Sequence, residues 1–328
     1  MLSYLVRRIL LALLTVWAVS VLSFIIIQLP PGDYVTAYIA EQESMGNVIS
    51  ESEAANLRAQ YGLDQPIYVQ YAKWIGRMLQ GNFGESFEWR RPVMDVIGDR
   101  LTLTVILSLA AVLFTWIIAL PIGIYSAMRQ YSLADYLFTF FSFAGVAVPG
   151  FLLALVMMYL GFKLFNLDAG GLFSQQYEVA PWSLARVWDL AKHLPLPAAI
   201  LGLEGTAGSM RIMRANLLDE LRKPYVVTAR AKGLSELRVV LKYPVRLALN
   251  PFVSTIGYIF PYIVSGSIIV SLVLSLPTVG PVLLKALIAQ DQFLAGTIIL
   301  LLGIMTVVGT LFSDVLLMLL DPRIRMEE

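Results

Sequence analysis

The chain has 328 residues, of which 58% are hydrophobic and 14% charged, whereas soluble domains carry about 45–50% apolar and about 25% charged residues. This composition excludes an ordinary cytosolic enzyme. The 24 basic and 23 acidic residues give a formal net charge of +1, so the charge balance indicates no nucleic-acid partner. The chain has no Cys and one His, which excludes disulfides and cysteine nucleophiles and argues against a tightly bound transition metal.

Long uncharged runs predict helices that cross a bilayer, because about 20 apolar helical residues span a hydrocarbon core about 30 Å thick. We expect one membrane-spanning helix from each of four runs that contain no Asp, Glu, Lys or Arg: Ile9–Leu29, Leu101–Met128, Tyr136–Phe162 and Phe293–Ser313.

Two further crossings are less regular. The uncharged run Leu247–Leu284 is too long for one helix and contains four prolines, so we place a crossing at about 252–275, with a short re-entrant or surface stretch after it. Leu194–Met210 has two prolines near its start and Glu204 in its interior, and we accept it as the sixth crossing. The expected fold class is an all-α polytopic membrane protein with six transmembrane helices.

The charge distribution predicts which segments face the cytoplasm. Arg7 and Arg8 precede a first run that is too long for a signal peptide, so we expect a permanent helix with its N-terminus inside. Six crossings then place both termini inside, together with loop 211–246 and its nine basic residues. We divide the chain into a first membrane helix with its preceding residues (1–29), an outer helical domain (30–100), and a membrane core with the inner loop (101–328).

The outer domain contains two predicted helices. Ser50 to Glu53 has the spacing of a capping box that begins the first helix, and Gly62 suits the position after its end. The second helix runs from Pro66 to Gln80 and has one apolar stripe. Two interpretations of the stripe stay open: it packs on the outer ends of the membrane helices, or it is a docking surface for an external partner.

The inner loop 211–246 predicts two short helices joined by a tight bend. Pro224 can begin the first helix, Gly233 can end it in a left-handed cap, and Ser235 can cap a second helix that runs to about Tyr243. Taken alone, this pattern also fits a basic hairpin that lies on anionic lipid.

Glu204 is the one carboxylate well inside a predicted span. A lone ionisable residue there is costly and usually faces the bundle interior. Two roles stay open: it lines a solute path, or it pairs with a neighbouring subunit.

Catalytic motifs are missing from the sequence. The chain lacks a Gly-x4-Gly-Lys-Ser/Thr loop for ATP phosphates and a His-Glu-x-x-His metal motif, and without Cys or a second His it lacks the usual nucleophile and base pairs. A proton-coupled carrier usually needs several intramembrane titratable groups, and one Glu is thin support.

Four segments in order resemble the permease subunits of bacterial binding-protein-dependent ABC importers, specifically the dipeptide/oligopeptide/nickel family. The resemblance covers nearly the whole chain. The segments are Met1–Leu10 with Pro31–Asp33; Gly62–Pro66 with Gln70–Tyr71 and Gly81–Ser86; Thr228–Leu234; and Leu320–Arg325.

This resemblance implies a type I ABC importer permease fold in the bacterial inner membrane, and alternating access as the mechanism. It also implies a second homologous permease, one or two ABC ATPase subunits, and a periplasmic binding protein that delivers solute to the 30–100 face. The chain itself would be non-catalytic and hold no cofactor, because ATP and Mg are bound by the ATPases.

In such permeases the inner loop is the coupling helix that sits in a groove of the ATPase. The general signature is Glu-Ala-Ala, three residues, then Gly, and the Glu and first Ala are replaced here by Val227 and Thr228. We expect Arg230 or Lys232 to supply the docking charge instead. The residues that carry this role over are Tyr225, Thr228, Ala229, Arg230, Ala231, Lys232, Gly233 and Leu234.

The substrate class implied by the family is oligopeptide, with oligosaccharide as the alternative. Nickel is disfavoured, because the chain has few soft ligands. A stand-alone secondary carrier or channel and a membrane-embedded enzyme are the competing functions; no internal repeat favours the first, and no converging polar side chains favour the second.

Overall fold

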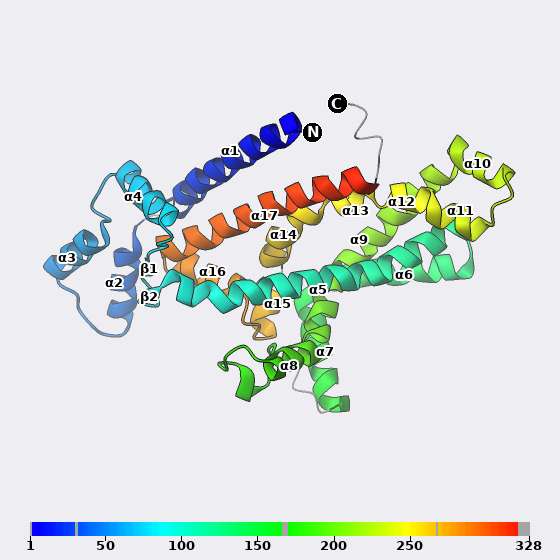
Figure 1. Cartoon of the computed structure of the whole chain (residues 1–328). Helices are drawn as coiled ribbons and strands as arrows, with labels where there is room; N and C mark the ends of the chain where they lie inside the picture. The colour runs from blue at the N-terminus through cyan, green and yellow to red at the C-terminus, as the bar shows by residue number, and fades with distance from the viewer. Residues whose placement is uncertain (1, 30–31, 166–169, 267, 321–328) are drawn as a thin grey trace. The chain divides into compact units, whose positions relative to one another are not determined.

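The computed structural model describes residues 2–29, 32–165, 170–266 and 268–320. Met1, Pro31 and residues 321–325 of the motifs above lie outside these ranges. The described residues are helical apart from connections and one two-stranded antiparallel sheet, in which Glu85 pairs with Pro92 (Figure 1). The expected all-helical class is confirmed.

The chain divides into two compact units, and the long helices α5 (Val93–Met128) and α17 (Gln292–Leu320) contribute residues to both. Unit 1 comprises Met1–Thr104 and Thr278–Val307, and unit 2 comprises Val105–Pro277 and Val308–Glu328.

Unit 1 contains one long apolar helix and several short elements. These are α1 (Leu2–Ile27), α2 (Tyr34–Ser44), α3 (Glu51–Tyr61), α4 (Ile67–Leu79), β1 (Glu85–Ser86), β2 (Arg91–Pro92) and α16 (Val279–Ile288).

The predicted ends of α3 and α4 are confirmed. Ser50 Oγ accepts a hydrogen bond from the Glu53 amide at 3.3 Å, and Gly62 follows α3 with a left-handed φ of 71°. Pro66 precedes α4, and Gly81 follows it with a φ of 78°. Only glycine adopts this backbone conformation without strain, so the turn positions could be found from the sequence.

The apolar stripe of α4 packs inside unit 1. Trp74 is 2% exposed and packs in a cluster with Phe24 of α1 and Leu300 of α17. The hydroxyl of Tyr71 lies 2.8 Å from Ser20 Oγ of α1. The interpretation of the stripe as packing surface is therefore confirmed.

Among the described residues, three helices are long and apolar enough to cross a membrane: Arg7–Ile27 within α1, α5 and α17. Their exposed side chains are largely aliphatic and aromatic, as a lipid-facing helix requires.

Unit 2 contains the remaining elements, most of them short. These are α6 (Leu133–Ala147), α7 (Gly150–Phe165), the 3-10 helix η1 (Gln175–Tyr177), α8 (Leu184–His193), α9 (Pro195–Leu221), α10 (Pro224–Ala231), α11 (Glu236–Lys242), α12 (Pro244–Ala248), α13 (Asn250–Ser254), the 3-10 helix η2 (Ile256–Tyr258), α14 (Ile259–Gly266) and α15 (Ile268–Val273).

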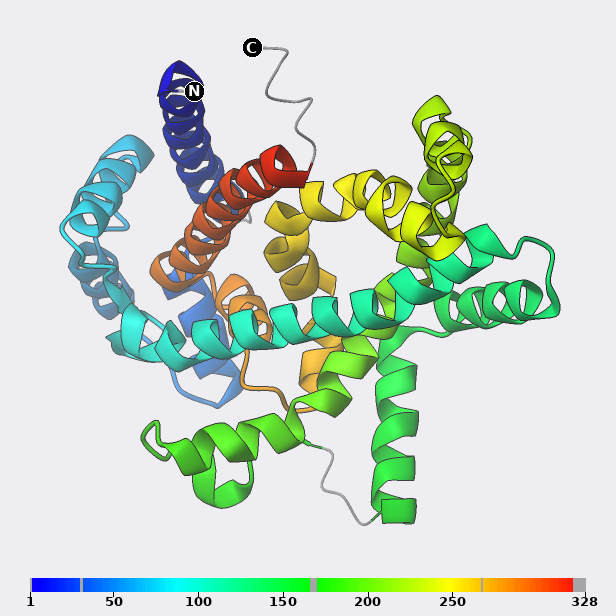
Figure 2. The ribbon, with the colours of Figure 1, turned by 45° about the vertical axis from the view of Figure 1, so that its right-hand side comes forward.

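The expected single helix over Tyr136–Phe162 is wrong. Val148 is extended, and it separates α6 from α7, which run in different directions (Figure 1, Figure 2). The physical reason is Pro149, because proline disfavours a helical conformation in the residue before it.

The expected crossing at 252–275 is likewise not one continuous helix. It is divided into α13, η2, α14 and α15, and Pro251 and Pro261 lie within the first turns of α13 and α14. Proline is tolerated in a first turn but cannot continue a helix that precedes it. The stretch that follows is α16.

Helix α9 runs unbroken through the expected sixth crossing and beyond it. It packs closely on α5. The two helices approach each other at Gly202, where an added Cβ would lie only 2.7 Å from the Ala111 carbonyl oxygen. Thr115 Oγ1 donates to the Gly202 carbonyl at 2.8 Å. Small residues and hydroxyl hydrogen bonds of this kind hold helices together where no hydrophobic drive operates.

Candidate functional site

The polar hairpin of unit 2, residues 224–242, is the strongest candidate site. Helix α10 begins at Pro224, Gly233 turns the chain with a left-handed φ of 76°, and α11 begins after Ser235. The predicted bend is confirmed. Ser235 precedes α11 as predicted, but its side chain makes no capping hydrogen bond.

The hairpin has a small apolar core of its own. Val226 and Val239 are fully buried and Ala229 is 6% exposed, and together they pack α10 against α11. Tyr225 and Leu234 are half-buried at the edge of this core. Of the predicted coupling residues, Tyr225, Ala229 and Leu234 therefore shape the hairpin.

Two polar contacts fasten the hairpin across its turn and at its base. Arg230 forms a bidentate ion pair with Glu236, with Nη2–Oε1 at 2.6 Å and Nε–Oε2 at 3.0 Å. This hydrogen bond raises the pKa of Arg230 and lowers the pKa of Glu236. At the base, the Tyr225 hydroxyl donates to Glu220 Oε2. Glu236 and Glu220 were missed in the sequence analysis, because only the bend brings them to their partners.

The hairpin is mounted on the helices of unit 2. Val240 of α11 packs in a buried cluster with Met213 and Leu217 of α9 and Phe252 of α13. Arg246 of α12 donates to the Leu319 carbonyl of α17 at 2.6 Å. The hairpin and the α12 helix that follows it are thus in contact with α9, α13 and α17.

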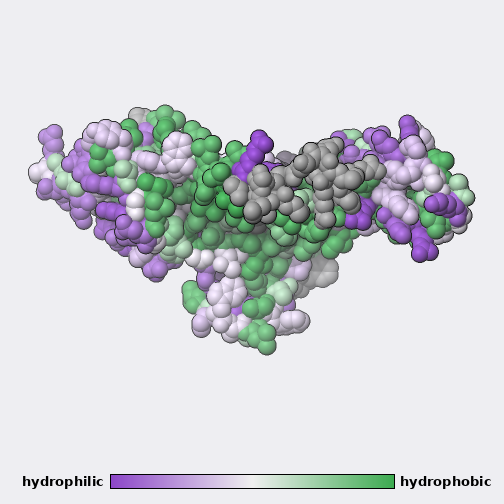
Figure 3. Space-filling model, turned by 45° about the horizontal axis from the view of Figure 1, so that its top comes forward, coloured by the Kyte–Doolittle hydropathy of each residue, from purple (hydrophilic) through white to green (hydrophobic). Residues whose placement is uncertain are grey.

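The free face of the hairpin combines apolar and basic residues. Val227, Leu237 and Leu241 are 57%, 63% and 51% exposed, an unusual set for a water-facing surface. The predicted residues Thr228, Arg230, Ala231, Lys232 and Gly233 are exposed as well. Hydrophilic residues gather over this end of unit 2 (Figure 3).

A buried ion pair holds the connection between α5 and α6 to α9. Asp135 is 2% exposed, and its Oδ2 lies 2.8 Å from Arg214 Nη2. The same oxygen accepts a hydrogen bond from the Tyr131 amide at 3.0 Å. Arg214 lies on α9, the helix that leads into the hairpin, whereas Asp135 lies on α6. Sequence spacing gave no signal for the pair, because 79 residues separate its members.

Glu204 lies in the interior of α9 with an exposed side chain. A Cβ at Gly150 of α7 would lie 3.7 Å from Glu204 Oε2, and Tyr262 of α14 is close enough to interact with it electrostatically. Tyr262 also lines a cavity of about 300 Å³ with Thr115, Tyr258 and other residues of α5, α9, η2 and α14. Glu204 is therefore close to Tyr262 at the edge of this mainly apolar cavity, without lining it.

Comparison with known proteins gives consistent matches along the chain. The family described as "Binding-protein-dependent transport system inner membrane component" matches residues 119–326, and its N-terminal counterpart, "Binding-prot-dependent transport system membrane comp, N-term", matches residues 1–110. The first match includes the hairpin and Glu204, and the second includes the 34–92 segment.

Individual relatives match over nearly their full lengths. The chain is 35% identical to the oligopeptide transport system permease protein AppB of Bacillus subtilis over 326 residues, 99% of each chain. It is 33% identical to the glutathione transport system permease protein GsiC of Salmonella typhimurium over 325 residues, 99% of each chain. It is 30% identical to the dipeptide transport system permease protein DppB of Lactococcus lactis over 330 residues, 99% of this chain and 100% of the relative.

Proposed function

Because the chain belongs to the binding-protein-dependent transport system inner membrane components, the permease subunits of ABC importers, we propose that it passes peptides into the cytoplasm by alternating access. The family predicted from the four sequence segments is confirmed. The chain is a multi-pass protein of the inner membrane, a non-catalytic translocation subunit that binds no cofactor itself.

The substrate class rests on the relatives. The three described above are permeases for oligopeptides, glutathione and dipeptides, and all are peptides in chemical terms. This favours peptide over oligosaccharide as the cargo of this chain.

The proposed topology has six crossings with both termini in the cytoplasm, the 30–100 domain outside, and the membrane core at 101–328. Three long apolar helices support it directly, and α9 is continuous across the expected crossing Leu194–Met210. The α6–α7 and α13–α15 segments are interrupted. Interrupted backbone is tolerated in a bilayer where protein covers it or it lines a water-filled path, so these two regions are the expected borders of the path.

The hairpin is the proposed ATPase-coupling element. The observation that carries this role is a self-contained pair of short helices, mounted on several membrane helices, with apolar Val227, Leu237 and Leu241 exposed among basic residues. Such a surface fits a groove on an ATPase subunit better than it fits water. The remaining partners are a second homologous permease, one or two ABC ATPase subunits, and a periplasmic binding protein.

Transport in proteoliposomes tests the function. The vesicles contain the chain with its partner permease, ATPases and binding protein, and are offered radiolabelled peptides and oligosaccharides. We expect ATP-dependent uptake of peptide alone. Uptake of oligosaccharide without peptide would contradict the substrate class, and flux through this chain by itself would indicate a carrier or channel.

A substitution of Glu204 separates the two roles left open for it. We propose that it borders the path beside Tyr262, so Glu204→Gln should lower peptide uptake while the importer assembles normally. If Glu204 instead pairs with the neighbouring permease, the same variant will co-purify with less of that subunit. Asp219→Gln, also on α9, serves as the control for charge removal.

A further inference from the structure

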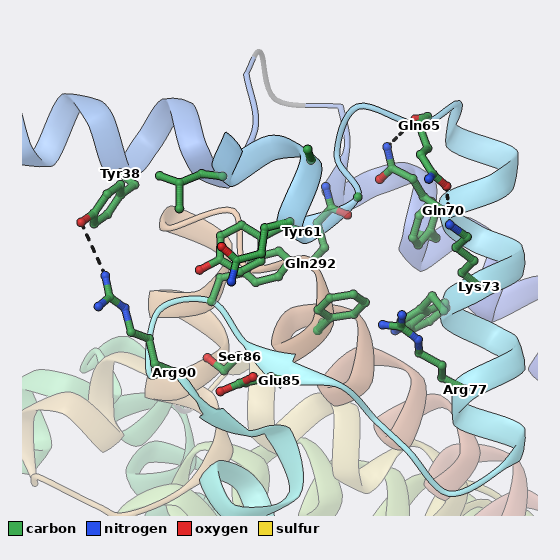
Figure 4. A pocket seen from close by; sticks show the side chains of 18 of the residues that line it. Tyr38, Tyr61, Gln65, Gln70, Lys73, Arg77, Glu85, Ser86, Arg90 and Gln292 are labelled. Atoms are coloured by element: carbon green, nitrogen blue, oxygen red, sulfur yellow. Dashed lines mark hydrogen bonds between the residues drawn. The ribbon is translucent and has the colours of Figure 1, made fainter. Parts of the chain in front are cut away.

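Unit 1 contains a second cavity, of about 760 Å³ and open to the surface, among α3, α4, β1 and the start of α17 (Figure 4). Every residue that lines it belongs to this one unit. Its volume lies within the roughly 300–1,000 Å³ of small-molecule sites.

Aromatic rings give the cavity a rigid wall. The rings of Tyr61 and Phe87 lie 4.5 Å apart, and Phe293 meets Phe87 edge to face at 5.0 Å. Phe87 is 3% exposed, and its carbonyl accepts a hydrogen bond from Tyr34 at 2.8 Å. The shape of the cavity is thus set by buried packing.

A second wall is cationic. Lys73 and Arg77 lie four residues apart on α4, and Figure 4 shows the Arg77 side chain pointing into the cavity. Lys73 Nζ donates to Gln65 Oε1 at 2.6 Å. Across the described residues, no carboxylate pairs with Lys73 or Arg77. Like charges at this spacing destabilise a helix, so an anion between them would be favourable.

An acidic side chain and several side-chain amides also line the cavity. Glu85 of β1 lies across the cavity from α4 (Figure 4), and the described part of the chain gives it no ion pair. Gln28 Nε2 lies 3.2 Å from Gln70 Oε1 and 3.4 Å from Gln292 Oε1. Gln70 Nε2 already donates to the Gln65 carbonyl at 2.7 Å, so Gln292 is the amide of this pair that can donate to a ligand. Side-chain amides can donate to and accept from a peptide backbone.

From this arrangement we infer that the cavity binds a short peptide, with its terminal carboxylate at Arg77 and Lys73 and its ammonium group at Glu85. The aromatic wall receives side chains, and Gln292 contacts the peptide backbone. This inference rests on the proposed function for the choice of peptide, and on the proposed topology for placing the cavity outside the membrane. The site would hold cargo before it enters the path.

Binding to the assembled importer in lipid nanodiscs, without the binding protein, tests the site. The probes are penta-alanine and its C-terminal amide, measured by isothermal titration calorimetry. We expect saturable binding of penta-alanine, and binding at least tenfold weaker for the amide. The same loss is expected for penta-alanine with the Lys73→Gln/Arg77→Gln variant.

Arg91→Gln is the matched control. Arg91 is an exposed cation of β2 that does not line the cavity, so its replacement should leave penta-alanine binding unchanged. An equal loss with this variant would mean general electrostatic attraction and overturn the inference.

Three other results also overturn it: no saturable binding, equal binding of the amide, or binding that appears only when the binding protein is present. The amide comparison uses the wild-type chain, so it decides the question even if the double variant does not assemble. Peptide uptake in proteoliposomes is measured separately. Uptake without binding at the cavity would contradict the inferred site but leave the proposed function standing. An absence of uptake would count against the proposed function.

Discussion

The 34–92 segment of unit 1 and the 224–242 hairpin of unit 2 are both polar structures joined to apolar helices, but different groups hold them. In unit 1 the carboxylate of Asp291, which is fully buried, accepts hydrogen bonds from Ser86 Oγ at 2.5 Å and from the amides of Glu88 and Leu294 at 3.2 and 3.1 Å. It thereby ties β1 to the first turn of α17.

The hairpin relies on exposed groups instead. The side chains of Arg230 and Glu236 are 43% and 52% exposed, so water and salt screen their attraction. Its other constraints are the small apolar core around Val226 and Val239 and the left-handed backbone at Gly233. A buried carboxylate with three donors fixes the 34–92 segment to α17, whereas a turn, a small apolar core and a screened ion pair keep the shape of the hairpin that we propose as the coupling element.

Removal of the buried carboxylate should have the largest effect. Asp291→Ala leaves the Ser86 hydroxyl and two amides without an acceptor, which should lower the free energy of unfolding by about 3 kcal/mol. Thermal unfolding of the purified chain in detergent measures this. Asp64→Ala, at an exposed site of unit 1, should change the stability by less than about 0.5 kcal/mol. Equal effects of the two variants would contradict the role of the buried carboxylate in holding the 34–92 segment.

Strain at the hairpin turn should come next. Gly233→Val forces a β-branched residue into a left-handed conformation at a cost of about 1–2 kcal/mol. We expect ATP hydrolysis to continue while peptide uptake falls, because the exposed face of the hairpin changes shape. Gly46→Val is the matched control, since Gly46 also has a left-handed φ, of 83°, after a helix (α2), has open space around it and does not line the unit 1 cavity. Normal uptake by an assembled Gly233→Val importer would contradict the coupling role.

A smaller effect should depend on pH. Burial raises the pKa of Asp291, so the folded state binds its proton more tightly than the unfolded state does. The contribution of this group to stability should therefore fall as the pH rises from the ordinary pKa of 3.8 through the raised value. Asp291→Asn lacks this titration. Unfolding temperatures of both proteins are measured across pH, and the wild type should lose stability relative to Asp291→Asn as the pH rises. A difference in unfolding temperature that stays constant across pH would contradict this prediction.

The smallest effect should come from the exposed ion pair. Arg230→Gln should lower stability by about 0.5 kcal/mol or less at low salt, and by less at high salt. Because the pKa of Glu236 is lowered by Arg230, the contribution of the pair should be present above the ordinary pKa of 4.5 and lost as the pH falls through the lowered value. Chemical denaturation at two salt concentrations measures it. A loss as large as that of Asp291→Ala would show that the hairpin is held as firmly as the 34–92 segment.

Local signals in the sequence predicted the short elements well. Ser50, Gly62, Pro224 and Gly233 all stand at the helix ends expected of them, because caps and turns depend on the backbone preferences of single residues. The apolar runs predicted α1, α5 and α17 for a similar reason. Prediction failed at Tyr136–Phe162, where hydropathy outweighed the conformational effect of Pro149.

The candidate site was predictable in part. The segment Thr228–Leu234 carried the family resemblance, and its bend was foreseen. The sequence did not predict the roles of Glu220 and Glu236, which fasten the hairpin, or the exposed apolar surface of Leu237 and Leu241. These roles follow from how α10 and α11 pack on each other.

By itself, the sequence determined the membrane class, the family and the turns, since apolar length, motif order and glycine or proline positions are properties of neighbouring residues. The tertiary structure decided which residues meet. Asp291 reaches Ser86 across 205 positions, Asp135 reaches Arg214 across 79, and the cavity gathers Arg77, Glu85 and Gln292 from three elements. Such contacts depend on the packing of whole helices, which no local pattern of residues encodes.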